Sequence, residues 1–321
     1  MLGIVGVTKV WGGIYSRLAE RSVMAGATER LRQSCERRVG SKIDGKYALD
    51  ALLGFGTTGA VYKATNTWSG REVAVKVFHY QGERQEVALQ RFVREAQASN
   101  RVRKEGRVHP NVVDSIDVGR DGDGSFYTVQ EYLRGVTLLD HLDTLPDRRM
   151  SLSDVAALLP VVDAMACAHE AGVVHRDLKP ENIFLAETPE GVVPKVLDFG
   201  IAQLADARLT SSHDLMGTPA YMAPEAFLDA REVDARADVW GLGVIFYEAI
   251  SGEVPFGQHA DTLIAVMREI ATQEPPSLID RGLMGPSTWA ILRRCLQREP
   301  ARRFPDARAL QAALLDVFPT V

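Results

Sequence analysis

The chain has 321 residues, of which 46% are hydrophobic and 25% are charged. This composition is typical of a globular protein, and the length allows one large domain or two lobes with a real core. A formal net charge of −5 and a pI near 5.9 argue against a strongly basic nucleic-acid-binding protein. The three cysteines, at positions 35, 167 and 295, form no CxxC pair, so we expect no disulfide framework or zinc knuckle, and a reducing cytoplasm fits best.

Residues 1–46 form a basic extension that contains nine Lys or Arg and four Asp or Glu. No part of the chain approaches the roughly 20 apolar residues of a membrane-spanning helix, so no transmembrane span is predicted. The first fifteen residues are apolar but short, are interrupted by Lys9 and lack a clear signal-peptide pattern. We therefore favour a frayed or surface-docked extension, with peripheral membrane contact through residues 1–35 as the alternative.

The next part of the chain predicts an antiparallel sheet with one helix. Runs of strand-forming residues separated by turn residues indicate strands at 47–53, 60–64, 72–78, 112–118 and 126–131. Residues 84–104 switch to helical spacing, with Leu89, Phe92, Val93 and Ala96 on one face. Residues 187–194 are interpreted as a surface loop inserted between two short strands.

Helices dominate the remainder of the sequence. Apolar periodicity predicts helices at 153–171, 238–250, 262–271, 288–297 and 306–318. Pro160 either kinks the first of these helices or marks a helix that starts just before it. The predicted fold class is α+β, with a small antiparallel β lobe carrying one helix (47–131), a larger α-helical lobe (132–318) and a short tail (319–321).

A glycine-rich turn, Gly54-Phe55-Gly56-Thr57-Thr58-Gly59-Ala60-Val61, fits the pattern G-x-G-x-x-G-x-V. Such a pattern also marks dinucleotide sites, where a helix follows the glycines. Here the residues that follow predict a strand, which favours a β-hairpin whose backbone N–H groups lie over phosphates.

Lys76 ends the run Val73-Ala74-Val75-Lys76 on the second strand after this turn. Strand alternation places Ala74 and Lys76 on one face, with Val61 on the neighbouring strand. The two small apolar residues could cover an adenine, and the lysine could reach its phosphates. On the following helix, Glu95 shares the inward side with Phe92 and is the candidate ion-pair partner of Lys76.

The most specific pattern is the string His-Arg-Asp-Leu-Lys-Pro-Glu-Asn at 175–182, followed by Asp198-Phe199-Gly200. Asp177 is the candidate base, which would accept the proton of an attacking hydroxyl. Lys179 could neutralise charge on a transferred phosphoryl group. Asn182 and Asp198 offer the amide and carboxylate oxygens that Mg²⁺ prefers.

Together these motifs resemble those of the eukaryotic-like serine/threonine protein kinases that are also widespread in bacteria, and the resemblance covers residues 47–318. It implies a phosphate-covering glycine loop, a Lys76–Glu95 ion pair, Asp177 as base, and Asn182 and Asp198 as metal ligands. It further implies that Glu225 pairs with Arg303, and that Asp238 supports the catalytic loop from a buried helix. Nucleotide contacts are implied for Leu53, Gly54, Phe55, Gly56, Thr57, Thr58, Gly59, Ala60, Val61, Ala74, Lys76, Glu131, Leu133 and Phe184.

The resemblance implies ATP and Mg²⁺ as cofactors, with Mn²⁺ as the alternative ion, and protein substrates rather than nucleic acid. Lys179 and the run from Gly217 to Glu225 are like the Ser/Thr branch of the family. Arg176 precedes the base, and in the family such an arginine can pair with a phosphorylated activation segment. Autophosphorylation is therefore expected at Thr210, Ser211 or Ser212.

Three other functions are compatible with parts of the sequence. A catalytically silent kinase scaffold is disfavoured because every chemical position is filled. A small-molecule kinase of the same fold usually lacks the Gly-Thr-Pro-Ala-Tyr and Ala-Pro-Glu residues found at 217–225. A dinucleotide oxidoreductase would need a βαβ unit after the glycines.

Overall fold

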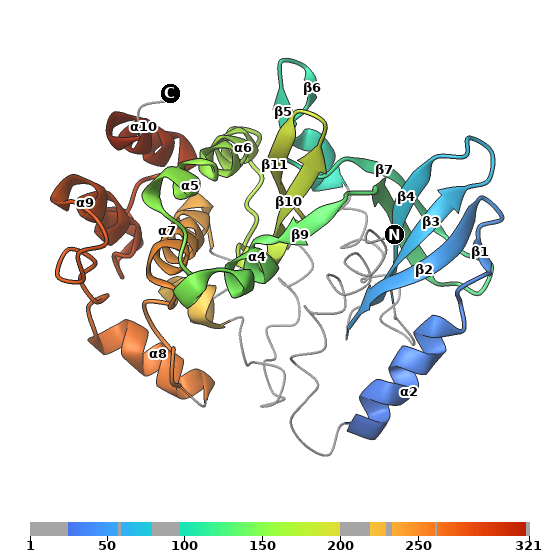
Figure 1. Ribbon diagram of the computed structural model, residues 1–321, viewed down its shortest axis with the longest axis horizontal. Helices are drawn as coiled ribbons and strands as arrows, with labels where there is room; N and C mark the ends of the chain where they lie inside the picture. Colours follow the sequence, from blue (N-terminus) through green and yellow to red (C-terminus); the bar gives the residue numbers. More distant parts are fainter. Residues whose placement is uncertain are drawn as a thin grey trace. The chain divides into compact units, whose positions relative to one another are not determined.

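The computed structural model describes residues 25–56, 59–78, 97–199, 219–228, 233–260 and 262–318. The chain divides into two compact units (Figure 1). The first comprises residues 1–100, 113–136 and 186–193, and the second comprises residues 101–112, 137–185 and 194–321. Each unit has its own core.

The first unit is built on a six-stranded sheet. In the order of the sheet, its strands are β1 (Lys42–Ile43), β2 (Tyr47–Phe55), β3 (Gly59–Asn66), β4 (Glu72–Phe78), β8 (Phe126–Glu131) and β7 (Ser115–Arg120). All pairings are antiparallel, as the sequence predicted. One face carries a core that includes Tyr62, Val75, Tyr127 and Val129.

Helix α2 (Ala25–Glu36) precedes this sheet and packs on its core. Cys35 is 1% exposed, and Leu31 packs against the same cluster. The Tyr62 hydroxyl donates a hydrogen bond of 3.0 Å to the Cys35 carbonyl oxygen. Residues 25–46, the described end of the basic extension, are therefore part of the first unit, in line with the favoured expectation of a docked extension. Residues 1–24 lie outside the described part.

Three sequence expectations in this region need correction or lie outside the description. The strand predicted at 112–118 begins at Ser115, because Val112 forms an isolated parallel bridge with Val196 instead. The predicted loop 187–194 is mostly strand, since β10 (Ile183–Thr188) and β11 (Gly191–Val196) leave only a two-residue turn. Of the helix predicted at 84–104, only residues from 97 onward are described, and they are helical as far as residue 101.

The strands β10 and β11 form a three-stranded sheet with β9 (Gly135–Thr137), in the order β11-β10-β9. The division between the two units passes through these strands. A separate two-stranded hairpin is formed by β5 (Arg103–Lys104) and β6 (Arg107–Val108) in the second unit.

The second unit is mainly helical. Its α-helices are α4 (Leu138–Thr144), α5 (Leu152–Ala156), α6 (Leu159–Glu170), α7 (Ala235–Ser251), α8 (Leu263–Thr272), α9 (Pro286–Cys295) and α10 (Ala307–Val317). Short 3₁₀ helices are η1 (Pro146–Arg148), η2 (Pro180–Asn182), η4 (Pro219–Tyr221), η5 (Pro224–Phe227) and η6 (Pro300–Arg302). The single helix predicted at 153–171 is two helices, and α6 starts just before Pro160, as one of the two alternatives stated.

Helix α7 is the centre of this unit, because every residue from Ala237 to Ser251 is buried. A helix that is apolar all round is typical of a core position, and α6, α9 and α10 pack against it. Asp234 caps its N-terminus, and Gly252 ends it with a φ of 79°. Among the described residues, only Leu152–Glu170 is long and apolar enough to cross a membrane, and half of that stretch is buried inside the protein.

Candidate functional site

Residues 175–182, called the catalytic string below, lie in the second unit between α6 and β10. The Lys179 Nζ atom is 2.9 Å from the Asp177 carboxylate. The Asn182 amide nitrogen donates to the Asp177 carbonyl oxygen at 2.7 Å and to its carboxylate at 3.1 Å. The 3₁₀ turn η2 produces this arrangement, because it folds Asn182 back toward the residue five positions earlier. The predicted base thus has its orientation fixed by two predicted neighbours.

Asp238 of α7 holds the start of the same string. Its carboxylate accepts the backbone N–H of His175 and that of Arg176, each at 2.7 Å, and is 2.9 Å from His169 Nε2. Burial alone would raise the pKa of Asp238, but the hydrogen bonds and the neighbouring histidines lower it overall. The carboxylate, which is 1% exposed, is therefore compensated by donors from the loop it supports. This confirms the contact expected of Asp238.

His175 joins the string to the segment that contains Asp198. Its Nδ1 accepts the Asp177 backbone N–H at 3.3 Å, so its Nε2 carries the proton donated to the Leu197 carbonyl oxygen at 2.9 Å. The Leu197 N–H in turn donates to the Asn182 carbonyl oxygen at 2.8 Å. The residue before Asp198 is thus hydrogen-bonded to both ends of the catalytic string.

Two residues here have left-handed backbone conformations that are uncommon outside glycine. Arg176 has a φ of 69° and Asp198 a φ of 35°. Such conformations cost about 1–3 kcal/mol each and persist only where surrounding contacts impose them. The hydrogen bonds of Asp238 and His175 supply those contacts.

The residue types of Asn182 and Asp198 suit a hard divalent cation. Because the Asn182 amide nitrogen donates to Asp177, its side-chain oxygen is the atom left for a cation. An amide oxygen and a carboxylate, completed by phosphate oxygens and water, match the ligand preference of Mg²⁺.

The first unit contains most of the residues predicted to contact the nucleotide. Leu53, Val61 and Ala74 form a small buried cluster against which Tyr132 packs. Val61 pairs directly with Lys76 across β3 and β4, as strand alternation predicted. The Lys76 ammonium lies 5.2 Å from the centre of the Phe78 ring. Small apolar residues and a lysine therefore share one face of the sheet.

The glycine-rich turn requires glycine at Gly59. A Cβ atom at this position would lie 2.3 Å from the Val77 carbonyl oxygen, which no side chain can accept. The Gly56 N–H donates to the Gly59 carbonyl oxygen at 2.8 Å and closes the turn. Gly54 and Ala60 are buried in the strands on either side, and Phe55 is half-buried.

The remaining predicted nucleotide residues have mixed environments. Leu133 is half-buried, and Phe184 in β10 is 1% exposed. Glu131 uses its carboxylate and its N–H to bind the Asp114 backbone, at 2.9 and 3.0 Å. Thr57, Thr58, Glu95, Gly200, Thr210, Ser211 and Ser212 lie outside the described residues.

Two glutamates of the second unit were not singled out as functional from the sequence. Glu181 stands inside the catalytic string, and Glu248 lies far along the chain in α7. The Tyr221 hydroxyl donates to Glu248 at 2.6 Å. The position of Glu181 between Asp177 and Asn182 was the one available signal, and Glu248 had none, because it lies in an apolar helical run.

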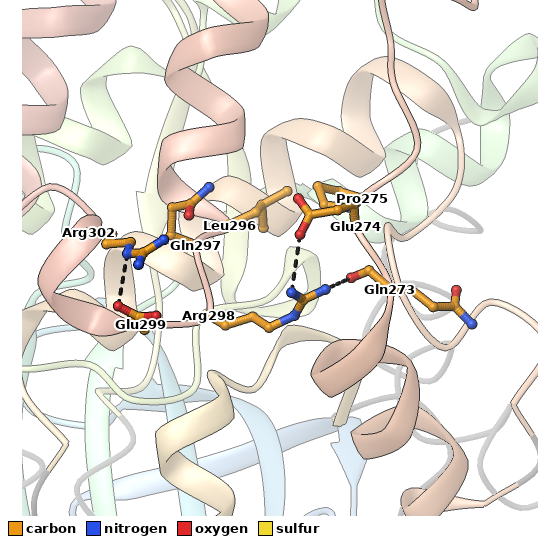
Figure 2. Close-up of a pocket in the computed structure, with 8 residues that line it drawn as sticks. All are labelled: Gln273, Glu274, Pro275, Leu296, Gln297, Arg298, Glu299 and Arg302. Carbon is orange, nitrogen blue, oxygen red and sulfur yellow. Dashed lines mark hydrogen bonds and ion pairs between the residues drawn. The ribbon is translucent and has the colours of Figure 1, made fainter.

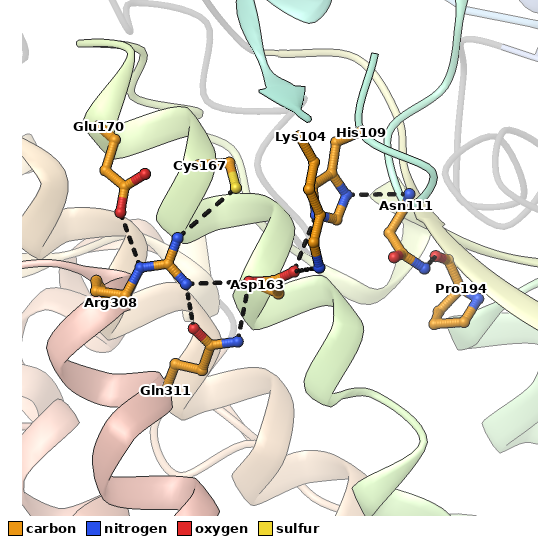
Figure 3. Close-up of polar contacts among 9 residues, drawn as sticks. All are labelled: Lys104, His109, Asn111, Asp163, Cys167, Glu170, Pro194, Arg308 and Gln311. Atoms are coloured by element: carbon orange, nitrogen blue, oxygen red, sulfur yellow. Dashed lines mark hydrogen bonds and ion pairs between the residues drawn. The ribbon is translucent and has the colours of Figure 1, made fainter. Parts of the chain in front are cut away.

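A second polar cluster connects β5 and the segment after β6 to α6 and α10 (Figure 3). The Asp163 carboxylate accepts hydrogen bonds from Lys104 at 2.6 Å, His109 at 3.1 Å, and Arg308 and Gln311 at 3.0 Å each. The ligand atoms of His109, Asp163 and Cys167 lie within 4.8 Å of one another, as in a metal site. However, two cationic side chains already contact the same carboxylate, so this cluster is suited to holding elements together rather than to binding a cation.

A pocket of about 130 Å³ lies between the end of α8 and the turn after α9 (Figure 2). It is lined by Gln273, Glu274, Pro275, Leu296, Gln297, Arg298, Glu299 and Arg302, none of which was predicted to be functional. Its charged groups pair with each other, Arg298 with Glu274 at 3.1 Å and Arg302 with Glu299 at 2.8 Å. These pairs leave no excess charge to attract a ligand.

Comparisons with known proteins agree with the resemblance to protein kinases. A family model described as "Protein kinase domain" matches residues 47–315. Curated relatives include the serine/threonine-protein kinases pkn3 (34% identical over 86% of this chain) and Pkn1 (38% over 84%) of Myxococcus xanthus, and PkaA of Streptomyces coelicolor (35% over 85%). The chain covers 50%, 38% and 50% of these proteins, so it spans half their length or less. The PknI kinase domain of Mycobacterium tuberculosis has a similar fold, with a TM-score of 0.64 and 24% identity over 88% of this chain and 99% of that one.

Proposed function

Because this chain belongs to the protein kinase domain family and is of the bacterial serine/threonine type, we propose that it transfers the γ-phosphoryl group of ATP to serine and threonine hydroxyls of proteins. One observation carries the proposal. Asp177 is oriented by Asn182 and Lys179, and Leu197, the neighbour of Asp198, is hydrogen-bonded to Asn182. Phosphoryl transfer depends on positioning of this kind more than on covalent chemistry.

In this proposal Asp177 accepts the proton of the substrate hydroxyl and orients its oxygen for in-line attack. The carboxylate is half-buried, and Lys179 at 2.9 Å keeps a positive charge beside it. Lys179 offsets negative charge on the transferred phosphoryl group in the transition state. Asn182 fixes the side-chain angle of the base through its amide nitrogen.

Asn182 and Asp198 would hold a divalent cation, for which Mg²⁺ is proposed and Mn²⁺ is the alternative. When bound, such an ion neutralises phosphate oxygens as a Lewis acid. The chain's own contribution is to keep the two oxygen ligands beside the base. The left-handed backbone of Asp198 and the hydrogen bond from the Leu197 N–H to the Asn182 carbonyl oxygen support this part of the proposal.

The sheet of the first unit is proposed to bind ATP. The apolar cluster of Leu53, Val61 and Ala74 would cover the adenine, and Lys76 on the same face would contact the phosphates, supported by Glu95. Backbone N–H groups of the glycine turn would lie over the phosphates. Contacts from Phe55, Thr57, Thr58, Ala60, Glu131, Leu133 and Phe184 remain part of this proposal.

Activation-segment phosphorylation at Thr210, Ser211 or Ser212 is proposed as the regulatory step. The support for it is Arg176, whose Nε atom is buried and has no partner among the described residues. Burial lowers the pKa of Arg176, and Asp238 opposes that shift. A phosphate group would supply the missing acceptor and a compensating charge.

We retain the proposals that the protein acts in the cytoplasm and that residues 1–35 make at most peripheral membrane contact. The proposed lobes are residues 47–131 and 132–318.

The activity is tested by incubating the protein with radiolabelled ATP, Mg²⁺ and a general protein substrate, followed by phosphoamino-acid analysis. Label on serine or threonine that disappears when EDTA removes the metal is the expected result. Label on neither residue, at any metal concentration, contradicts the proposal.

A further inference from the structure

Residues 101–108, called the basic hairpin below, concentrate positive charge on the surface of the second unit. They include strands β5 and β6 and contain four basic residues and one acidic residue, which gives a formal charge of +3 on a chain whose net charge is −5. All residues from 103 to 107 are exposed. None of them belongs to the catalytic string or to the predicted nucleotide contacts, so the proposed reaction leaves this charge unexplained.

Two of the four basic residues attach the hairpin to α6. The Lys104 ammonium donates to the Asp163 carboxylate at 2.6 Å (Figure 3). The Arg101 guanidinium donates to the Ala171 carbonyl oxygen, at the end of α6, at 2.9 Å. Val102 lies between them in sequence and is fully buried. The helix therefore holds the base of the hairpin in place.

The other two basic residues, Arg103 and Arg107, lie beside the turn. Arg103 Nη1 donates to the Gly106 carbonyl oxygen at 2.8 Å, which keeps its guanidinium near the turn. Arg107 is exposed, and its side chain makes no hydrogen bond or ion pair within the described part of the chain. The strand register pairs Arg107 with Lys104, so Arg103 and Arg107 lie on opposite faces of the hairpin. An extended chain that crosses the turn can contact both.

Local stability does not account for this concentration of charge. Lys104 and Arg107 stand directly opposite each other, and like charges in this position destabilise a pair of strands. The turn residues Glu105 and Gly106 both have left-handed backbone conformations, with φ of 53° and 79°. Such a turn favours Asn-Gly or Asp-Gly, and glutamate is uncommon there. An anion bound at Arg107 would offset the repulsion from Lys104.

The side chains of the hairpin distinguish between classes of anionic partner. Val102 is buried and Val108 is half-buried, so the hairpin offers no exposed apolar side chain to insert into a membrane. It contains no aromatic residue on which the bases of a nucleic acid could stack. The carboxylates of an acidic peptide need only the guanidinium donors that Arg103 and Arg107 present. Charge complementarity therefore favours an acidic protein segment.

We infer that the basic hairpin is a docking site for an Asp- and Glu-rich segment of proteins that this enzyme phosphorylates. The inference rests on the proposed phosphotransfer to proteins. A substrate held at the hairpin has its serine or threonine at a raised effective concentration, while the transfer step is left to Asp177. The expected signature is a lower KM at unchanged kcat for substrates that carry the acidic segment.

Fluorescence anisotropy tests the binding step with labelled Glu-Gly and Gln-Gly repeat peptides. At low ionic strength the full-length wild-type protein should bind the Glu-Gly repeat about tenfold more tightly. The double variant Arg103→Gln/Arg107→Gln should lose this preference, and it leaves the contacts with α6 unchanged. The matched control Arg37→Gln/Arg71→Gln removes the same charge from exposed positions of the first unit and should keep it. Thermal melting of each variant monitors folding.

A charge-reversal variant gives a gain of binding that a damaged protein would not show. Arg103→Glu/Arg107→Glu should prefer a Lys-Gly repeat over the Glu-Gly repeat. Raising the ionic strength to about 1 M, where charges are screened beyond about 3 Å, should weaken both preferences.

Phosphate transfer is then measured with one acceptor peptide joined to either repeat by a flexible glycine-serine linker. We expect a KM about tenfold lower with the Glu-Gly repeat in the wild type, and equal KM values in Arg103→Gln/Arg107→Gln.

Equal binding of the two repeats by the wild type, or an unchanged preference in Arg103→Gln/Arg107→Gln, would overturn the docking site and leave the kinase activity intact. Tighter binding of phosphatidylserine vesicles or single-stranded DNA than of the Glu-Gly repeat, lost in the same variant, would assign the hairpin another partner and also overturn the proposal. Binding of the Glu-Gly repeat without transfer to any substrate would overturn the proposed function, and with it the assignment of the acidic segment to a substrate.

Discussion

The Arg303 guanidinium forms a two-pronged ion pair with Glu225, with nitrogen–oxygen distances of 2.7 and 2.8 Å. The Arg303 side chain is fully buried, and its other donors bind the carbonyl oxygens of Gln297, Arg236 and Arg298. A single side chain thus connects η5, the start of α7 and the turn after α9. The resemblance to the kinase family implied this pair, and the contacts confirm it.

Replacing Arg303 with Met should lower the free energy of unfolding by about 3 kcal/mol, because it leaves the Glu225 carboxylate and three carbonyl groups without their donor. Urea denaturation measures the change. Arg302→Met is the control, since Arg302 is 65% exposed and its pair with Glu299 is at the surface. Equal stability of the two variants would show that the buried pair has no special structural role.

Asp238→Asn should reduce kcat more than it raises KM. The asparagine has one acceptor oxygen where the carboxylate offers two, so the backbone N–H of His175 or of Arg176 loses its partner. Displacement of the catalytic string by a fraction of an ångström to one ångström is expected to reduce kcat up to about 100-fold. Steady-state kinetics at saturating ATP measure it, with Glu170→Gln, exposed at the end of α6, as the control.

The Asp163 cluster predicts a specific pH dependence of stability. Burial would raise the pKa of Asp163, but hydrogen bonds from Lys104, Gln311, His109 and Arg308 lower it overall. A carboxyl whose folded pKa is depressed contributes stability above its unfolded pKa of about 3.9, and this contribution is lost as the pH falls below that value.

His109 acts in the same direction. Burial lowers its pKa, although Asp163 opposes the shift. The unfolded chain then binds a proton below about pH 6.5 that the folded chain resists, so stability falls as the pH drops through this range.

Asp163→Asn should therefore lower the free energy of unfolding by about 2–3 kcal/mol at pH 7. The difference between this variant and the wild type should shrink as the pH falls below about 4. Denaturant titrations across the pH range measure both quantities, and a constant difference would contradict the account.

Helix α2 should be required for the stability of the first unit. Deleting residues 1–36 removes Leu31 and Cys35 from the core cluster and the acceptor of the Tyr62 hydroxyl, and keeps strand β1. We expect a lower melting temperature than after deletion of residues 1–24 alone. Tyr62→Phe, which removes only the hydrogen bond, should cost about 1 kcal/mol. Equal melting temperatures of the two deletions would show that α2 is dispensable.

The elements that sequence could predict are those specified locally. Turn residues such as Ser69-Gly70 separate the strands of the first sheet, and Pro160 marks the start of α6. Helix α2 was missed because its polar composition gives little periodic signal, and it packs through few residues, including Leu31 and Cys35. The turn-rich residues around Pro189 concealed the β10–β11 hairpin, because strand pairing there depends on partners distant in sequence.

The difference between locally specified features and contacts between distant segments also applies to the site. Asp177, Asn182 and Asp198 lie in short contiguous motifs. Their residue types and spacing were enough to predict a base and two metal ligands. The supporting contact of Asp238 could be inferred only through resemblance. The contact between Tyr221 and Glu248 could not be inferred at all, because it depends on how two segments distant in sequence pack together.

The central claim is that Asp177 acts on the hydroxyl that attacks ATP, and single-turnover phosphate transfer by Asp177→Asn tests it most directly. We predict a transfer rate at least about 100-fold below that of the wild type, with ATP affinity retained. An Asp177→Asn protein that transfers phosphate to serine or threonine at the wild-type rate would contradict the account.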